Sequence, residues 1–175
     1  MKKDLQFIGI SGGSRRFRVA ASATRFYVGE PIHNVGTYTS GAISVNTWVV
    51  AAADTPVIGT HNFAGLANRD AKVNSAGTVI AQTGEVAVPI ASVTRIRGKA
   101  ETAASIDTDA ELLALLYDAT LIDYSSTGSA LSGPLYTIKE AASANSSGLV
   151  IVDGDIAKGT LDVIVSSNAL RQAVA

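Results

Sequence analysis

The chain is dominated by short stretches in which apolar and polar residues alternate with a period of two. Arg16-Phe17-Arg18-Val19 and Glu85 to Ile90 show this alternation, and Leu161, Val163 and Val165 alternate with their neighbours near the end. Such alternation is typical of β-strands with one buried face. Gly, Asn, Asp, Pro and Ser separate the stretches and favour turns. The pattern predicts strands at 5–10, 16–20, 24–28, 43–51, 57–59, 78–81, 85–90, 92–96, 135–138, 149–152 and 160–165.

Many short strands joined by tight turns favour an antiparallel fold. Pro89 lacks the N–H that a ladder needs, so its strand should lie at a sheet edge or end there. Before Gly98 no segment is long and periodic enough to form a crossover helix, which a parallel sheet would need. We therefore predict a mainly β protein, a small antiparallel β-barrel or β-sandwich.

One helix stands out, at about residues 109–119. Thr108 and Glu111 have the T-x-x-E spacing of a capping box, in which each side chain satisfies a free backbone amide of the other residue. Apolar residues then recur on one helical face, at 112, 115, 116 and 119. The sequence predicts one capped α-helix packed against the β-structure.

Composition adds information about partners. Hydrophobic residues make up 47% of the chain, aromatic residues only 6%, and charged residues 17%, below the usual ~25% of soluble domains. The low charge suggests that a partner covers part of the surface. There is no cysteine, which excludes disulfides and thiolate metal sites. We expect no secretory signal, because a short mixed run follows Met1 to Asp4 in place of an apolar h-region of about 7–15 residues. We expect no membrane span, because no apolar run approaches the ~20 residues required.

Charge is distributed unevenly along the sequence. Residues 1–30 hold six cations and two carboxylates, whereas residues 99–175 hold four cations and ten carboxylates. The basic segment could dock on an acidic partner surface or on the acidic end of a neighbouring copy; the alternative is ordinary solvated charge. The candidate partner contacts are Arg15, Arg16, Arg18 and Arg25.

These observations suggest three segments. Residues 1–30 form a basic N-terminal segment that could be a contacting arm with the first strands, and residues 31–98 form a β-rich body. Residues 99–175 contain the helix and a second β-rich part, which we expect to pack with the body as one domain.

Residues for catalysis or metal binding are scarce. His33 and His61 have no acidic or histidine partner at a helical ligand spacing, and no serine lies in a G-x-S-x-G elbow. Asp153 and Asp155 flank Gly154, but the rest of a calcium loop is missing, so a turn with two exposed carboxylates is the favoured interpretation. We predict no catalytic residue, metal or cofactor, and keep a small hydrolase with a serine or carboxylate centre as an alternative.

Nucleic-acid binding is a further alternative. The N-terminal arginines are interleaved with Phe17, Phe26 and Tyr27, a mixture that binders of single strands use. The net charge of −1 argues against it, because nucleic-acid interfaces are strongly basic.

A resemblance extends over most of the chain. The stretch from Val49 to Gly59, Gly77-Thr78-Val79-Ile80-Ala81 and the segments 148–155 and 160–165, in a small chain rich in Ala, Gly and Thr, resemble head decoration (cement) proteins of tailed bacteriophages. The resemblance implies a β-barrel or β-sandwich body on the outer surface of an icosahedral capsid, often a homotrimer, which clamps adjacent subunits of the major capsid protein.

The same resemblance implies a location and a mode of contact. The protein would be made in the host cytoplasm and would act in the virion, without enzymatic activity, nucleic acid or membrane, and residues 1–30 would provide shell contacts. A phage tail-tube or head–tail connector subunit is the alternative within the virion, since such subunits also combine sheets with a single helix.

Overall fold

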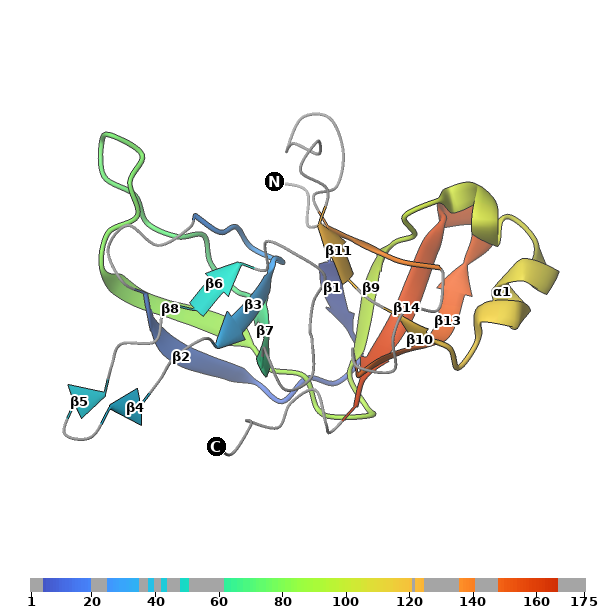
Figure 1. Cartoon of the computed structure of the whole chain (residues 1–175), viewed down its shortest axis with the longest axis horizontal. Coiled ribbons are helices and arrows are strands. Elements are labelled where there is room, and N and C mark those ends of the chain that lie inside the picture. The colour runs from blue at the N-terminus through green and yellow to red at the C-terminus, as the bar shows by residue number, and fades with distance from the viewer. Residues whose placement is uncertain are drawn as a thin grey trace.

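The computed structural model describes residues 5–19, 25–34, 38–39, 42–43, 48–50, 62–120, 122–124, 136–140 and 148–166. Two five-stranded antiparallel sheets dominate these residues, with one α-helix among them (Figure 1). The predicted mainly β, antiparallel class is confirmed.

The first sheet is built from the two ends of the chain. Its order is β1 (Leu5–Ile8), β9 (Arg95–Lys99), β14 (Thr160–Val165), β13 (Leu149–Asp155) and β10 (Ala119–Thr120). A separate pair, β11 (Ile122–Tyr124) with β12 (Tyr136–Ile138), lies beside it, and Ile138 bridges to Ala100.

The second sheet is built from the part of the chain between β1 and β9. Its order is β2 (Ser14–Val19), β8 (Gln82–Ala87), β7 (Asn62–Ala67), β3 (Pro31–Asn34) and β6 (Trp48–Val50). A small hairpin, β4 (Tyr38–Thr39) with β5 (Ala42–Ile43), accompanies it. The chain thus leaves the first sheet after β1 and returns to it in β9, and the basic segment 1–30 contributes β1 to one sheet and β2 to the other.

Among the strands that the structure describes, neither sheet closes into a barrel. Within the described residues, the first sheet ends at β1 and β10 and the second at β2 and β6. Closure needs outer strands that can pair along their length, but β10 meets β13 through only the pairs Ala119–Val150 and Thr120–Leu149. The barrel alternative was wrong for this reason.

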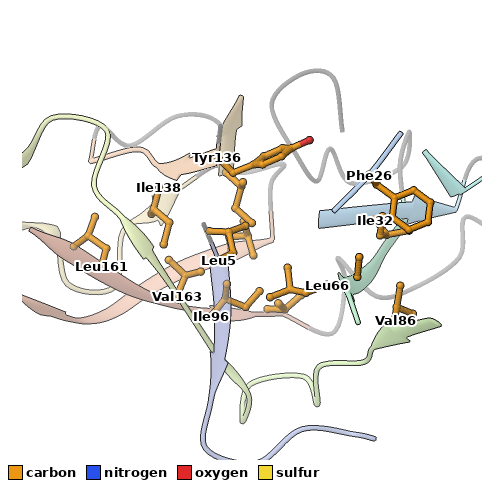
Figure 2. Packing of buried hydrophobic residues seen from close by; sticks show 14 of the residues in the cluster. Leu5, Phe26, Ile32, Leu66, Val86, Ile96, Tyr136, Ile138, Leu161 and Val163 are labelled. Atoms are coloured by element: carbon orange, nitrogen blue, oxygen red, sulfur yellow. The ribbon is translucent and has the colours of Figure 1, made fainter. Parts of the chain in front are cut away.

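One hydrophobic cluster joins the two sheets. Figure 2 shows buried side chains in a continuous band from Leu161 and Ile96 of the first sheet, through Leu66, to Val86 of the second. Strand β14 is buried on both faces, since Asp162 is as inaccessible as the leucine and valines that flank it. Two-sided burial explains the nearly continuous apolar run of this strand.

The helix α1 (Asp109–Leu115) begins as predicted but ends earlier than predicted. The Thr108 Oγ1 accepts from the Glu111 amide at 3.3 Å, and the Glu111 carboxylate accepts from the Thr108 amide at 3.1 Å, which confirms the capping box. Tyr117 then has φ +73°, and its amide donates to the Ile151 carbonyl of β13 at 2.8 Å. Residues 116–119 are therefore not helical, because the backbone at Tyr117 hydrogen-bonds to β13 and continues into β10, which pairs with β13.

Several other predicted strands have different bounds in the structure or do not form. The strand expected at 85–90 is β8, which ends at Ala87 and so confirms a stop before Pro89; the strand expected at 92–96 is β9, three residues later. Residues 25–28 do not form a strand; a turn at 27–30 forms instead, in which the Glu30 amide donates to the Tyr27 carbonyl at 3.1 Å and the Glu30 carboxylate accepts from the Tyr27 amide at 3.0 Å. Residues 78–81 form only the isolated bridge of Val79 to Val73. The strand expected at 57–59 lies outside the described residues.

Candidate functional site

A basic pocket lies on the second sheet, between β2, β8 and the connection from β7 to β8. Its volume is about 450 Å³, and its cations are Arg16, Arg69 and Lys72. Arg16 stands directly opposite Glu85 in the β2–β8 ladder, which places one carboxylate in the same wall. Three cations against one carboxylate leave the pocket positively charged. The remaining wall is formed by Ile80, Ala81, Gln82, Thr83 and Gly84.

The carboxylate of Glu85 stays ionised among these cations. Hydrogen bonding to Ser14 is the main reason that the pKa of Glu85 lies below its ordinary value, and Asn68, Arg69 and Arg16 lower it further. The Arg69 guanidinium lies 3.2 Å from the Glu85 carboxylate. Arg69 is therefore partly neutralised, while Arg16 and Lys72 keep charge available for an anionic group from outside.

Two side chains fix the backbone of the connection that carries Lys72, one from the start of β8 and one from the tip of the connection. The Gln82 side chain accepts from the Lys72 amide at 2.9 Å and donates to the Lys72 carbonyl at 3.1 Å. At the tip, Asn74 Oδ1 accepts from the amides of Ala76 and Thr78 at 3.0 and 2.9 Å. These hydrogen bonds fix the backbone conformation of the loop that forms the rim of the pocket.

Three of the four predicted contact arginines share one strand, and the fourth lies outside it. Arg15, Arg16 and Arg18 all lie in β2, where their register partners are Val86, Glu85 and Thr83. The Arg25 guanidinium lies over the Tyr27 ring, 4.8 Å from its centroid, a cation–π contact. Contact of these four arginines with an acidic partner stays a prediction.

Sequence reasoning missed Arg69 and Lys72, which share the pocket with Arg16. These two cations are far from Arg16 in the sequence and flank the carboxylate of Asp70, so no local run of charge marks them. Only the pairing of β2 with β8, and of β8 with β7, brings them together.

A second feature is a group of three exposed apolar residues whose backbones lie close together where the two sheets are connected; we call it the apolar waist. It consists of Ile10, Ile90 and Val93, whose exposed fractions are 68%, 37% and 51%. The fully buried Thr94 holds their backbones together: its hydroxyl donates to the Ile10 carbonyl at 2.6 Å and accepts from the Ile90 amide at 2.7 Å. Figure 1 shows both connections running close together below β1 and β9.

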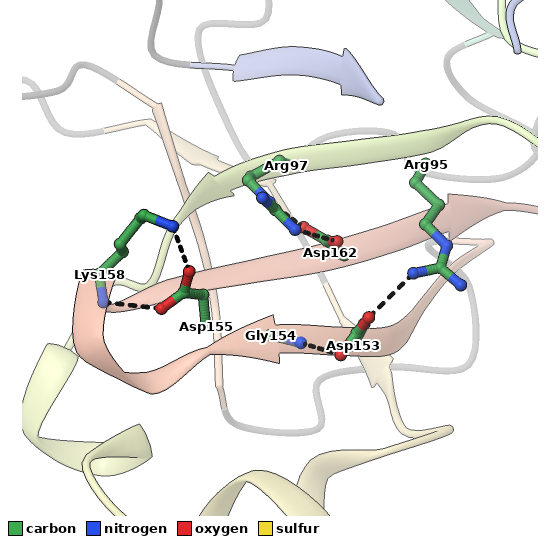
Figure 3. Close-up of polar contacts among 7 residues, drawn as sticks. All are labelled: Arg95, Arg97, Asp153, Gly154, Asp155, Lys158 and Asp162. Atoms are coloured by element: carbon green, nitrogen blue, oxygen red, sulfur yellow. Dashed lines mark hydrogen bonds and ion pairs between the residues drawn. The ribbon is translucent and has the colours of Figure 1, made fainter. Parts of the chain in front are cut away.

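A third feature is a row of ion pairs on β9, β14 and β13 (Figure 3). Arg97 grips the buried carboxylate of Asp162 through two hydrogen bonds of 2.6 and 2.7 Å. Arg95 binds Asp153 at 2.9 Å at a more exposed place. The Asp162 hydrogen bonds raise the pKa of Arg97, so the guanidinium keeps its charge throughout the ordinary pH range. Internal pairing leaves this face little charge for a ligand.

The predicted turn at 153–155 belongs to strand β13, and the turn follows it as a 3₁₀ segment, Ile156–Lys158. Asp155 caps that segment by accepting from the Lys158 amide at 3.1 Å, and its other oxygen lies 2.5 Å from the Lys158 ammonium. Hydrogen bonding to Lys158 lowers the pKa of Asp155. The turn was placed too early because Gly154 fits a strand here, packed against Leu112.

The described residues contain neither a metal-binding cluster nor a helix that could span a membrane. Among the described residues, no three His, Asp or Glu side chains gather as metal ligands would. Over those same residues, the helix α1 is far too short and polar to cross a bilayer, and no other helix qualifies. The side chains of His33 and His61 lie outside this description.

Comparison with known proteins found no matching family model, no matching curated protein and no matching solved structure. The function must therefore be inferred from the surfaces of this chain and not from a relative. The basic pocket and the apolar waist are open to partners, whereas the ion-paired face is satisfied within the molecule.

Proposed function

We propose that the protein is a non-enzymatic virion structural protein: a decoration, or cement, protein that binds the outside of a tailed-phage capsid and stabilises it. The partners are the major capsid protein and further copies of the chain itself. The observation that carries the proposal is the apolar waist.

The waist has the properties of a protein-docking surface. Exposed apolar side chains gathered at one place mark contacts with other macromolecules more often than scattered ones do. Here Ile10 and Val93 remain mostly exposed, although the backbone that carries them is fixed by Thr94. A rigid carrier reduces the conformational entropy lost when such a surface is covered.

The free energy gained by burying the waist fits a contact that is weak by itself and is repeated many times on a capsid lattice. Complete burial of one isoleucine or valine side chain stabilises by about 1.5–3 kcal/mol, so three partly exposed residues would give one weak contact. On a capsid the contact repeats, and linked copies gain affinity through effective concentration. The low overall charge and the resemblance to decoration proteins support the same function.

The test uses capsids of the source phage assembled without this protein. Purified protein is added, bound protein is measured by co-sedimentation, and the rupture temperature of the capsids is recorded. We expect binding and a raised rupture temperature, both lost in Ile10→Ser/Val93→Ser. Gln6→Ser, an exposed change on β1, is the matched control and should bind like the wild type.

Three results would contradict the proposal. The wild type could fail to bind, it could bind without changing the rupture temperature, or the waist variant could bind as well as the control. Stacked rings or tubes of isolated protein in electron micrographs would favour the tail-tube alternative instead. Circular dichroism must first show that the variants are folded; exposed substitutions usually change stability by no more than about 0.5 kcal/mol.

A further inference from the structure

The two ends of the molecule carry opposite charge. The basic pocket lies on the second sheet, by the loop between β7 and β8, and α1 lies at the other end of the long axis (Figure 1). The segment 101–118 around α1 holds five carboxylates and no lysine or arginine. We call this segment the acidic end; its carboxylates are Glu101, Asp107, Asp109, Glu111 and Asp118.

The acidic end also exposes large apolar side chains. Leu112, Leu115 and Leu116 pack against the core, but Leu113 is 67% exposed and Tyr117 is 78% exposed. The helix α1 and the non-helical segment after it therefore expose one aliphatic and one aromatic side chain in a stretch that is rich in carboxylates. Tyrosine is enriched at protein interfaces, because it offers a large apolar ring with a polar tip.

Two carboxylates of this end, those of Asp107 and Glu111, repel each other. Asp107 and Glu111 share a hydrogen bond, and that contact together with the charge of Glu111 raises the pKa of Asp107. A cation from outside would relieve this repulsion. The basic pocket has the complementary set of groups, since it joins Arg16, Arg69 and Lys72 to the exposed side chain of Ile80.

We propose that the chain associates head to tail: the acidic end of one copy, with Leu113 and Tyr117, docks on the basic pocket of the next copy, beside Ile80. The occupant of each surface is a second copy, because the two surfaces match in charge and each has an apolar part. This inference rests on the self-association that belongs to the proposed function and names its surfaces.

The arrangement has a consequence for symmetry. The two surfaces differ, so the interface is heterologous, and each copy keeps one free surface of each kind until a ring closes. Because the surfaces lie near opposite ends of the long axis, association produces a ring or an open chain of subunits, not a two-fold dimer. Charged contacts of this kind weaken with salt, since the screening length falls from about 10 Å at 0.1 M to about 3 Å at 1 M.

A charge-swap experiment on the full-length chain tests the inference. The pocket variant is Arg69→Glu/Lys72→Glu, and the end variant is Glu101→Lys/Asp109→Lys; both leave the capping box of Thr108 and Glu111 in place. Each variant alone brings like charges together. When the two variants are mixed in equal amounts, contacts between unlike variants join opposite charges again. The native acidic end of the pocket variant meets the native basic pocket of the end variant, and the altered basic end meets the altered acidic pocket.

Association is measured by sedimentation equilibrium at low salt and at about 1 M NaCl. We expect the wild type to associate at low salt and each variant alone to associate at least about tenfold more weakly, a change of roughly 1.4 kcal/mol. The mixture should recover the wild-type affinity to within a few-fold. Arg95→Glu, which reverses an exposed cation away from both surfaces, is the matched control and should associate like the wild type.

A monomeric wild type at low salt, single variants that associate normally, or a mixture that stays dissociated would overturn the inference. Far-UV circular dichroism establishes that each variant is folded before it is scored. The charge-swap experiment and the capsid assay can fail independently of each other. Charge-swap recovery without capsid binding would overturn the proposed function alone, and capsid binding without any charge-swap effect would overturn this inference alone.

Discussion

The ion pair between Arg97 and Asp162 should be the most important polar contact of the first sheet. The Asp162 side chain is 1% exposed and receives two hydrogen bonds from the guanidinium. Its register partner on β13 is another carboxylate, Asp153. Without Arg97, a buried negative charge would stand beside a like charge with no counterion.

The substitution Arg97→Met isolates this effect, because methionine keeps much of the apolar stem. Removing one partner of a buried ion pair costs about 3–5 kcal/mol. Arg97 is 28% exposed, so water reaches part of the site and the cost should fall to the bottom of that range or below it, about 2–3 kcal/mol. For a chain of this size that corresponds to a fall of roughly 5–10 °C in the melting temperature.

The matched control is Arg95→Met, two residues away on the same strand. The pair of Arg95 with Asp153 has side chains that are 45% and 53% exposed, and such pairs contribute about 1 kcal/mol or less. The double variant Arg97→Met/Asp162→Leu removes both charges and should recover most of the loss. Urea unfolding followed by far-UV circular dichroism gives the free energies. Equal losses in the two single variants, within about 0.5 kcal/mol, would refute the reasoning.

Two further predictions concern the backbone and the acid limit of stability. Gly65 has φ +140°, and a Cβ there would lie 1.9 Å from the Ala87 carbonyl oxygen, so Gly65→Ala should destabilise by at least about 2 kcal/mol. Gly77→Ala, with positive φ but open space around it, should cost about 1 kcal/mol in the same thermal melts, and equal losses would contradict the packing argument. Because Lys158 lowers the pKa of Asp155 below 3.8, their contact stabilises the fold above that pH, and this stabilisation is lost as the pH falls through the lowered pKa. Asp155→Asn should therefore flatten the acid side of a stability-against-pH curve; parallel curves for variant and wild type would argue against it.

Sequence reasoning succeeded where local chemistry decides the structure. The capping box located the start of α1, and the alternation in 160–165 located β14. It failed where contacts with residues distant in the sequence determine the local structure. The segment 25–28 has strand-forming residues, but Glu30 and Asp70 accept from its amides and hold its end in the turn at 27–30. Strand β7 was missed because its short sequence includes Gly65, which weakens a strand pattern yet is required by the close approach of β8.

The same distinction applies to the candidate surfaces. The sequence pointed to Arg16 as a partner contact, and the pocket contains it. Lys72 joins it only through the ladder of β2, β8 and β7, which no local pattern encodes. The apolar waist was missed because Ile10 and Ile90 look like ordinary strand residues in the sequence; they follow the ends of β1 and β8, where the chain passes between the sheets.

The nested order of the sheets bears on how the chain folds. The hydroxyl of Thr94 bonds the carbonyl of Ile10 across 84 positions of sequence, and β1 pairs with β9 over a comparable separation. Closing so long a loop in an unfolded chain is slow, and the contacts that reward closure come late. Once the second sheet has formed between them, the two distant segments emerge close together and the search becomes short. We therefore expect the second sheet to form first and to bring β1 and β9 together, so a substitution that slows the formation of β2–β8 should also slow the pairing of β1 with β9 in refolding experiments.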